Sequence, residues 1–179
     1  MDRKLLINEQ LLTIIIRRLC EQLLENHGDF SNTVLIGLQP KGIFLAQKIQ
    51  QQLLQIIQKE VPLGYLDVTF FRDDFRRRDG IVKANATKID FVIEGKMVIL
   101  IDDVLYTGRT VRSALDAMTA YGRPLNVELL VLIDRRYSRD LPIEANYIGK
   151  QVDSIHSQRV SVELKEQGFE QDTIWIVDK

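Results

Sequence analysis

The sequence predicts an α/β fold: a doubly wound, mostly parallel sheet flanked by helices, in a single domain over residues 1–179. Three short aliphatic runs carry this prediction, because runs without polar alternation are typical of strands buried on both faces of a parallel sheet. They lie at residues 34–36, 98–101 and 129–133. Helical patterns separate them, and the order strand, helix, strand, helix, strand is that of a doubly wound sheet.

The N-terminal half is expected to contribute two helices and one further strand. The first helix begins after Asn8, a favoured N-cap residue, and ends near Gly28. The second covers residues 42–58, where apolar residues recur at close to a helical period. A strand pattern follows at about residues 64–71.

The C-terminal half is expected to hold a third helix and a small hood over the sheet. The helix covers residues 110–121, and Gly122 followed by Pro124 ends it. We expect the hood within about residues 135–179, built from short β patterns at 146–149, 160–164 and 173–177.

One polar segment, at about residues 72–90, has no steady period. A connection of this length inside a compact domain is usually disordered or a functional flap. We expect a flexible flap here.

Composition and charge exclude several classes of protein. Hydrophobic residues make up 45% and charged residues 27%, which is typical of a globular chain and not of a disordered one. The net charge of −1 gives the chain no overall attraction to nucleic acid. Cys20 is the only cysteine and is expected to be a packed, unreactive thiol, which suits a reducing compartment. Without a membrane-length apolar run or a cleavable leader, a cytoplasmic location is expected.

A helix start that suits a phosphate group follows the second aliphatic run. Thr107, Gly108, Arg109 and Thr110 open the third helix. A helix N-terminus presents unpaired backbone N–H groups and the positive end of the helix dipole. The hydroxyls of Thr107 and Thr110 add donors, and Gly108 lets the backbone approach a ligand closely. The sequence therefore predicts a phosphate site, although its glycine spacing is not that of a Walker loop.

Asp102 and Asp103 stand between that strand and the phosphate site. They lie at the carboxyl end of the strand, where ligands bind in open α/β sheets. Two carboxylates would repel a phosphate, so we expect them to face ribose hydroxyls together with a divalent cation. A ligand with a phosphate at one end and a diol at the other is a ribose 5-phosphate. The alternative, two acids that merely precede an ordinary helix cap, does not explain the whole ordered run.

Residues 102–112 read DDVLYTGRTVR, a run that resembles the signature with which type I phosphoribosyltransferases bind phosphoribosyl pyrophosphate (PRPP). The run is most similar to the branch of this family that joins uracil phosphoribosyl transfer with attenuation of pyrimidine operons. The resemblance continues almost end to end, at residues 37–43, 71–74, 132–135, 139–143 and 146–150. It implies a type I phosphoribosyltransferase-like version of the predicted fold.

The resemblance implies ligand contacts for two loops. The 5′-phosphate of PRPP is expected on Val104, Leu105, Tyr106, Thr107, Gly108, Arg109 and Thr110. The pyrophosphate is expected on Gln39, Pro40, Lys41 and Gly42, with a cis peptide bond between Pro40 and Lys41.

Four side chains are implied in catalysis. Asp102 and Asp103 would hold the ribose diol and reach Mg²⁺ only indirectly, because the metal is bound with PRPP. Lys41 would contact the pyrophosphate, and Arg72 would reach the same group when the flap closes.

The resemblance places the acceptor base near Asp134, Arg135 and Val160. We expect uracil as the base, with UMP and pyrophosphate as products. Tyr106 stands where purine-specific relatives carry an aspartate that handles a ring proton, which argues for a pyrimidine. A purine acceptor, hypoxanthine or guanine, is the alternative.

Pyrimidine operon leader RNA is the second partner that the resemblance implies. The candidate RNA-binding residues are Arg17, Arg18, Arg139 and Lys150. Glu21 stands where RNA-binding members carry histidine, and a carboxylate that faces RNA phosphate is unfavourable. A salvage enzyme that has lost RNA binding is therefore the alternative. A homodimer or higher homo-oligomer is also expected.

Overall fold

In a computed structural model of the chain, which describes residues 3–72, 84–155 and 157–178, the three aliphatic runs form the centre of a five-stranded sheet. The strand order is β3-β2-β4-β5-β6, and every neighbouring pair is parallel. The strands are β2 (Thr33–Leu38), β3 (Leu63–Leu66), β4 (Met97–Leu105), β5 (Asn126–Arg136) and β6 (Tyr147–Asp153). The predicted doubly wound α/β fold is confirmed.

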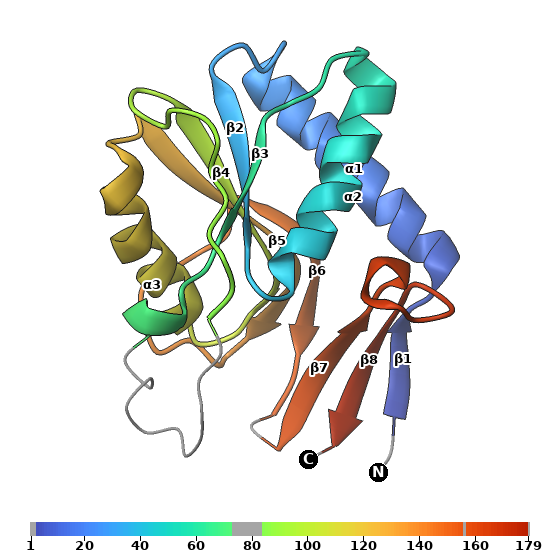
Figure 1. Cartoon of the computed structure of the whole chain (residues 1–179). Helices are drawn as coiled ribbons and strands as arrows, with labels where there is room; N and C mark the ends of the chain where they lie inside the picture. The colour runs from blue at the N-terminus through green and yellow to red at the C-terminus, as the bar shows by residue number, and fades with distance from the viewer. Residues whose placement is uncertain (1–2, 73–83, 156, 179) are drawn as a thin grey trace.

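Helices cover both faces of this sheet (Figure 1). Helices α1 (Glu9–His27) and α2 (Gly42–Ile57) lie on one face, and α3 (Arg109–Met118) lies on the other. The side chain of Asn8 caps α1 by accepting a 2.9 Å hydrogen bond from the backbone N–H of Leu11. Gly28 ends that helix, so both expected bounds are confirmed.

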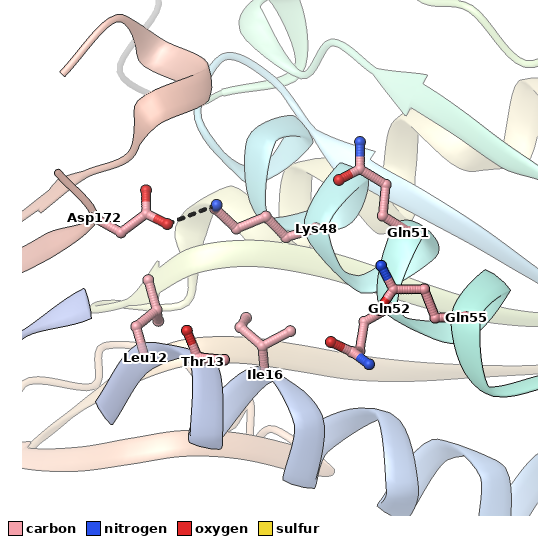
Figure 2. Close-up of a pocket in the computed structure, with 8 residues that line it drawn as sticks. All are labelled: Leu12, Thr13, Ile16, Lys48, Gln51, Gln52, Gln55 and Asp172. Carbon is pink, nitrogen blue, oxygen red and sulfur yellow. Dashed lines mark hydrogen bonds and ion pairs between the residues drawn. The ribbon is translucent and has the colours of Figure 1, made fainter. Parts of the chain in front are cut away.

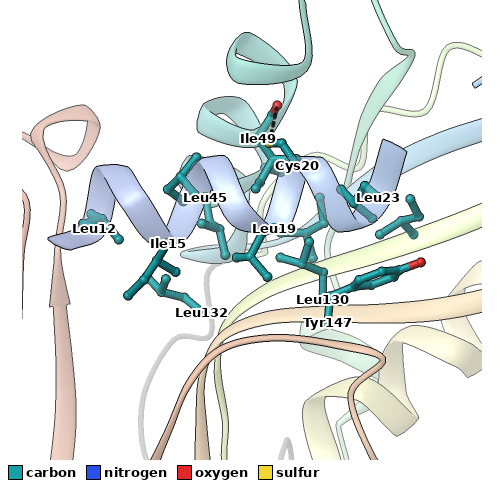
Figure 3. Close-up of a cluster of buried hydrophobic side chains, with 14 of the residues drawn as sticks. Leu12, Ile15, Leu19, Cys20, Leu23, Leu45, Ile49, Leu130, Leu132 and Tyr147 are labelled. Atoms are coloured by element: carbon teal, nitrogen blue, oxygen red, sulfur yellow. Dashed lines mark hydrogen bonds between the residues drawn. The ribbon is translucent and has the colours of Figure 1, made fainter. Parts of the chain in front are cut away.

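The buried stripe of α1 forms the core beneath one face of the sheet (Figure 3). It packs against α2 and against the central strands through Leu12, Ile15, Leu19, Leu23, Leu45, Ile49, Leu130 and Leu132. Burying each such side chain stabilises the fold by roughly 1.5–3 kcal/mol. Cys20 lies in this core, where burial raises the pKa of its thiol to about 12, so it stays protonated and unreactive.

A second, antiparallel sheet forms the hood, with the strand order β1-β8-β7. It contains β7 (Gln158–Glu163) and β8 (Thr173–Asp178), as expected, and also β1 (Arg3–Ile7), which the sequence did not predict. The expectation that residues 146–149 belong to the hood is wrong, because residues 147–149 lie in β6, which pairs in parallel with β5. A short apolar run identifies a strand but not the sheet to which it pairs.

Two other elements are shorter than expected. The strand predicted over 64–71 ends at Leu66 and gives way to a 3₁₀ turn at Thr69–Phe71. The break follows from Asp67, whose Oδ1 accepts hydrogen bonds from the backbone N–H of Thr69 at 3.2 Å and from its hydroxyl at 2.6 Å. Similarly, α3 ends at Met118 and continues as the 3₁₀ turn Thr119–Tyr121.

Most of the predicted flap, residues 73–83, lies outside the described residues. Its described C-terminal part returns to the sheet edge, where Lys88 forms an isolated antiparallel bridge with Tyr65. Within the described ranges, none of the helices combines the length and apolar character needed to cross a bilayer.

Candidate active site

The acid pair lies near the carboxyl end of β4, the central strand of the sheet. This end of the sheet faces the hood. Asp102 and Asp103 are each only 8% exposed. Their orientations are restrained locally: Asp102 Oδ1 accepts from the backbone N–H of Asp103 at 2.9 Å, and Asp103 Oδ1 accepts from that of Val104 at 2.8 Å. The site therefore presents two preoriented carboxyl groups at the place where parallel sheets bind ligands.

Two cations from other segments approach this pair. Burial raises the pKa of Asp102, the charge of Asp103 raises it further, and the charge of Arg72 lowers it. Burial also raises the pKa of Asp103, which the charge of Lys41 lowers. The four residues expected in catalysis are thus close enough to influence one another electrostatically, although they come from three separate segments.

The raised pKa values predict how the acid pair affects stability with pH. In the unfolded chain both carboxyls ionise near their ordinary value of 3.8, whereas in the folded protein they hold their protons to higher pH. The folded state therefore loses stability as pH rises from about 3.8 through the raised pKa values.

A double Asp102→Asn, Asp103→Asn variant lacks this loss of stability. We expect its Tm advantage over the wild type to grow as the pH rises above about 3.8 and to vanish below that pH. Thermal unfolding from pH 3 to 8 measures this, and a gain that grew on acidification would contradict it.

The expected pyrophosphate loop connects β2 to α2. The side-chain amide of Gln39 donates a 2.7 Å hydrogen bond to the carbonyl of Ala86, which joins the loop to the C-terminal part of the predicted flap. The expected cis peptide bond between Pro40 and Lys41 is wrong: the cis bond joins Gln39 and Pro40. This position suits the chemistry, because the bond before a proline is the one in which the cis form costs little.

Gly42 brings this loop against the acid pair. A Cβ atom on Gly42 would lie 2.5 Å from the carbonyl oxygen of Ile101, 2.9 Å from the Cα of Asp102 and 3.1 Å from Asp102 Oδ1. Only glycine allows so close an approach to the backbone of β4.

The expected 5′-phosphate loop wraps the N-terminus of α3. Gly108 is the N-cap residue and has φ 90°, a left-handed conformation that favours glycine. The hydroxyl of Thr110 accepts a 3.2 Å hydrogen bond from Arg72, so the flap arginine reaches this loop as well as the acid pair. Leu105 is buried in the core on the α3 face of the sheet, and Val104 packs against the core on the opposite face, so these two can offer a ligand only their backbone groups.

The expected base pocket contains a buried arginine that organises the hood. Arg135 Nε donates to Ser154 Oγ at 2.7 Å, and its Nη2 donates to the carbonyls of Ile155 and Gln158 at 3.2 and 3.0 Å. The same guanidinium lies 4.0 Å from the ring centroid of Tyr106, and burial lowers the pKa of Arg135. Its contacts therefore tie the hood to the phosphate loop.

The other two expected base-pocket residues differ in position. Asp134 is buried at the end of β5, where its carboxylate accepts from Arg139 at 2.5 Å and from Gln151 at 3.4 Å. Val160 lies in β7, partly buried against the core.

The candidate RNA-binding residues differ in their protein contacts. Arg17 pairs with Glu21 at 3.1 Å, and Arg18 donates to the carbonyls of β6, at 2.6 Å to Gly149. Arg139 is engaged beside Asp134, as described above, whereas Lys150 is exposed. Three of the four residues therefore have protein partners.

Two cavities adjoin the residues expected to bind the ligands. A cavity of 510 Å³ separates the pyrophosphate loop from the hood and is lined by Gln39, Pro40, Lys41, Ile43, Phe44, Asn85, Ser161, Val162, Gln167 and Phe169. A cavity of 630 Å³ reaches Asp134, Arg139 and Gln151 from the side of the β5–β6 connection.

A third cavity, of 160 Å³, lies between α1 and α2 (Figure 2). It is lined mostly by amide and apolar side chains, away from the acid pair. Lys48 lies at its edge and bridges Asp172 at 2.7 Å and Glu166 at 2.8 Å, which attaches the hood to α2.

No group of three or more His, Cys, Asp or Glu side chains is arranged to hold a metal ion within the described parts of the chain. The acid pair supplies oxygen donors, which Mg²⁺ prefers, but two carboxyls do not make a complete cage. The acid pair therefore fits a metal ion whose other oxygen ligands come from a bound molecule.

Comparisons with known proteins agree with this geometry. A family model described as phosphoribosyl transferase domain matches residues 5–167. Proteins named bifunctional protein PyrR, from Bacillus cereus (strain AH820) and Bacillus thuringiensis subsp. konkukian (strain 97-27), are each 38% identical over 182 aligned residues, which cover 99% of this chain and 99% of theirs.

Solved structures with similar folds include two purine enzymes. A hypoxanthine-guanine phosphoribosyltransferase (hpt-2) from Bacillus anthracis has a TM-score of 0.71 at 21% identity and covers 99% of both chains. The hypoxanthine phosphoribosyltransferase of Trypanosoma cruzi has a TM-score of 0.74 at 16% identity, over 98% of this chain and 96% of the other. At such low identity these likenesses show the fold alone.

Proposed function

The chain belongs to the phosphoribosyl transferase domain family, with full-length relatives named bifunctional protein PyrR, and from this premise we propose that it makes UMP and pyrophosphate from uracil and PRPP. The observation that carries the proposal is the buried acid pair at the end of β4, beside the N-terminus of α3 and within reach of Lys41 and Arg72. This arrangement matches a ribose with a phosphate at one end and a pyrophosphate at the other.

Each part of the site has one task in this reaction. The N–H groups at the start of α3, with Thr107 and Thr110, bind the 5′-phosphate. Asp102 and Asp103 accept hydrogen bonds from the ribose hydroxyls and stabilise the positive charge that develops on the ring as the bond from C1 to pyrophosphate breaks. The leaving group keeps the electron pair, a ring nitrogen of uracil supplies the pair for the new C–N bond, and that nitrogen loses its proton to water.

Lys41 and Arg72 face the departing pyrophosphate, whose charge they offset. Magnesium, which would arrive with PRPP and touch the acid pair only through the substrate, supplies further neutralisation of that leaving group. The two carboxyl groups of the acid pair, which do not form a complete cage among the described residues, are compatible with this indirect role.

A pyrimidine acceptor is favoured by Tyr106. The residue puts no carboxylate at the position where purine-specific relatives carry one, and its ring faces the guanidinium of Arg135. A second cation beside the pocket, Arg139, is already paired with Asp134. Asp134, Arg135 and Val160 thus surround the base without offering a free general base.

The direct test is turnover with each base. Purified protein is incubated with PRPP, Mg²⁺ and uracil, hypoxanthine or guanine in parallel, and the mononucleotide is quantified. We expect UMP from uracil and no purine nucleotide above background. Efficient formation of IMP or GMP, or no nucleotide at all, would reject the assignment.

We propose as a second role UMP-responsive binding of pyrimidine operon leader RNA, in a cytoplasmic homo-oligomer. The RNA role is supported by the full-length relatives, whose name includes the word bifunctional. Arg17, Arg18 and Lys150 are exposed, although Arg17 is also paired with Glu21 and Arg18 donates to a carbonyl of β6. Filter binding of the leader RNA from 50 to 300 mM salt, with and without UMP, tests this role. Salt-sensitive binding that UMP strengthens is expected, and binding that UMP does not alter would contradict it.

A further inference from the structure

Arg139 joins the two halves of the site. One nitrogen of its guanidinium, Nη1, donates to the backbone carbonyl of Tyr106, at the start of the phosphate loop. The other, Nη2, donates to Asp134 Oδ1 at 2.5 Å, at the edge of the expected base pocket. Gln151 donates to the second oxygen of the same carboxylate at 3.4 Å. Arg139 thus hydrogen-bonds the phosphate loop and the expected base pocket at the same time, beside the ring contact that Arg135 makes with Tyr106.

The residues after Arg139 support the same phosphate loop from outside. The backbone N–H groups of Asp140 and Leu141 donate to the carbonyl of Thr107 at 3.0 and 3.2 Å. The side chain of Ile143 lies 3.4 Å from the position of a Cβ on Gly108. The connection between β5 and β6 therefore forms a wall behind the loop, and Arg139 is the part of this wall that also reaches the base pocket.

We propose that Arg139 is a positioning residue that couples 5′-phosphate binding to base binding. The inference rests on the proposed function, because it assigns the two pockets as that function does. The side chains of Arg139 and Asp134 are only 23% and 10% exposed, so the pair is shielded from solvent and the loop geometry depends on it. A ligand that orders the phosphate loop also holds the Tyr106 carbonyl, and through Arg139 it holds Asp134.

The fork of the guanidinium is essential to this coupling. Arginine presents two parallel donors in a rigid plane, so it can hold two acceptors on different loops at once. Lysine keeps the charge beside Asp134 but presents a single ammonium on a flexible stem. A lysine at this position is therefore expected to preserve the ion pair and to lose the link to Tyr106.

Calorimetry with two ligands tests the proposal. Ribose 5-phosphate occupies only the phosphate and diol sites, whereas UMP also fills the base pocket. In Arg139→Met we expect ribose 5-phosphate to bind about tenfold more weakly and UMP about a hundredfold more weakly. Both ligands lose the support of the Tyr106 carbonyl, only UMP also loses that of Asp134, and each lost hydrogen bond to a charged group is worth about tenfold or more. Arg139→Lys, which keeps the buried charge paired and should fold, is expected to lie between Arg139→Met and the wild type for both ligands.

The control is Arg123→Met, which removes an exposed arginine near the opposite end of the sheet and is expected to change neither affinity. Equal loss of both ligands in Arg139→Met, or wild-type binding by Arg139→Lys, would overturn the coupling role. If the wild-type protein binds both ligands but does not convert uracil to UMP, the proposed reaction is rejected. The affinities measured for the Arg139 variants still test the coupling role.

Discussion

Replacing both Asp102 and Asp103 by asparagine is expected to lower UMP formation by at least about a thousandfold while the protein stays folded. Loss of one preorganised electrostatic group typically costs 10²–10³ in rate, and here both groups that face the developing positive charge are neutralised. Asparagine keeps the shape and can still accept the hydrogen bonds that Asp103 and Val104 donate. At neutral pH the variant also avoids the burial of two neighbouring carboxylates, so its Tm should equal or exceed that of the wild type.

The initial rate of UMP formation and the Tm of the same preparations test this prediction together. Asp90→Asn is the matched control, because it removes a carboxylate that is 75% exposed and paired only loosely, at 3.8 Å, with Lys88. Its rate should match that of the wild type. Wild-type turnover by the double asparagine variant would remove the acid pair from the mechanism.

The fold was largely predictable from the sequence because its strongest signals are local. Continuous aliphatic runs identified β2, β4 and β5, and residues at the helix ends gave both bounds of α1. The pairing of distant strands has no local signal. Residues Arg3–Ile7 become a strand only because β8 lies beside them, and β6 joins the main sheet only because β5 offers it a parallel edge.

The same division holds within the site. The acid pair and the phosphate loop are contiguous in sequence, so their order alone indicated a phosphate beside a diol. The contacts of Arg139 were not predictable, since they join the β5–β6 connection to the end of β4. From the sequence alone Arg139 was a candidate RNA-binding residue, because an arginine in a loop gives no signal of its partners. An alignment that showed Arg139 and Asp134 varying together would provide such a signal.

Gly42→Ala is expected to lower UMP formation by about a hundredfold and to destabilise the protein, although helix propensity alone predicts the opposite. Alanine at the start of α2 should gain up to about 1 kcal/mol over glycine. The new Cβ, however, would lie 2.5 Å from the carbonyl oxygen of Ile101 and 2.9 Å from the Cα of Asp102. These are backbone atoms of a buried central strand, so they cannot move aside as a flexible side chain would.

Steric overlap in a packed interior costs roughly 1–3 kcal/mol, so it should outweigh the gain in helix propensity and lower the Tm by a few degrees. The pyrophosphate loop must then move away from β4 and carry Lys41 with it, and about 1 Å of misplacement at a reacting group is enough for a hundredfold loss of rate.

Gly95→Ala is the control that separates the effect on stability from the effect on rate. Gly95 has φ 69° and open space around its Cβ position, so alanine there costs about 1–2 kcal/mol of backbone strain far from the site. We expect similar Tm losses in the two variants and a loss of rate only in Gly42→Ala. Equal rates would mean that the approach of the loop to Asp102 serves stability and not catalysis.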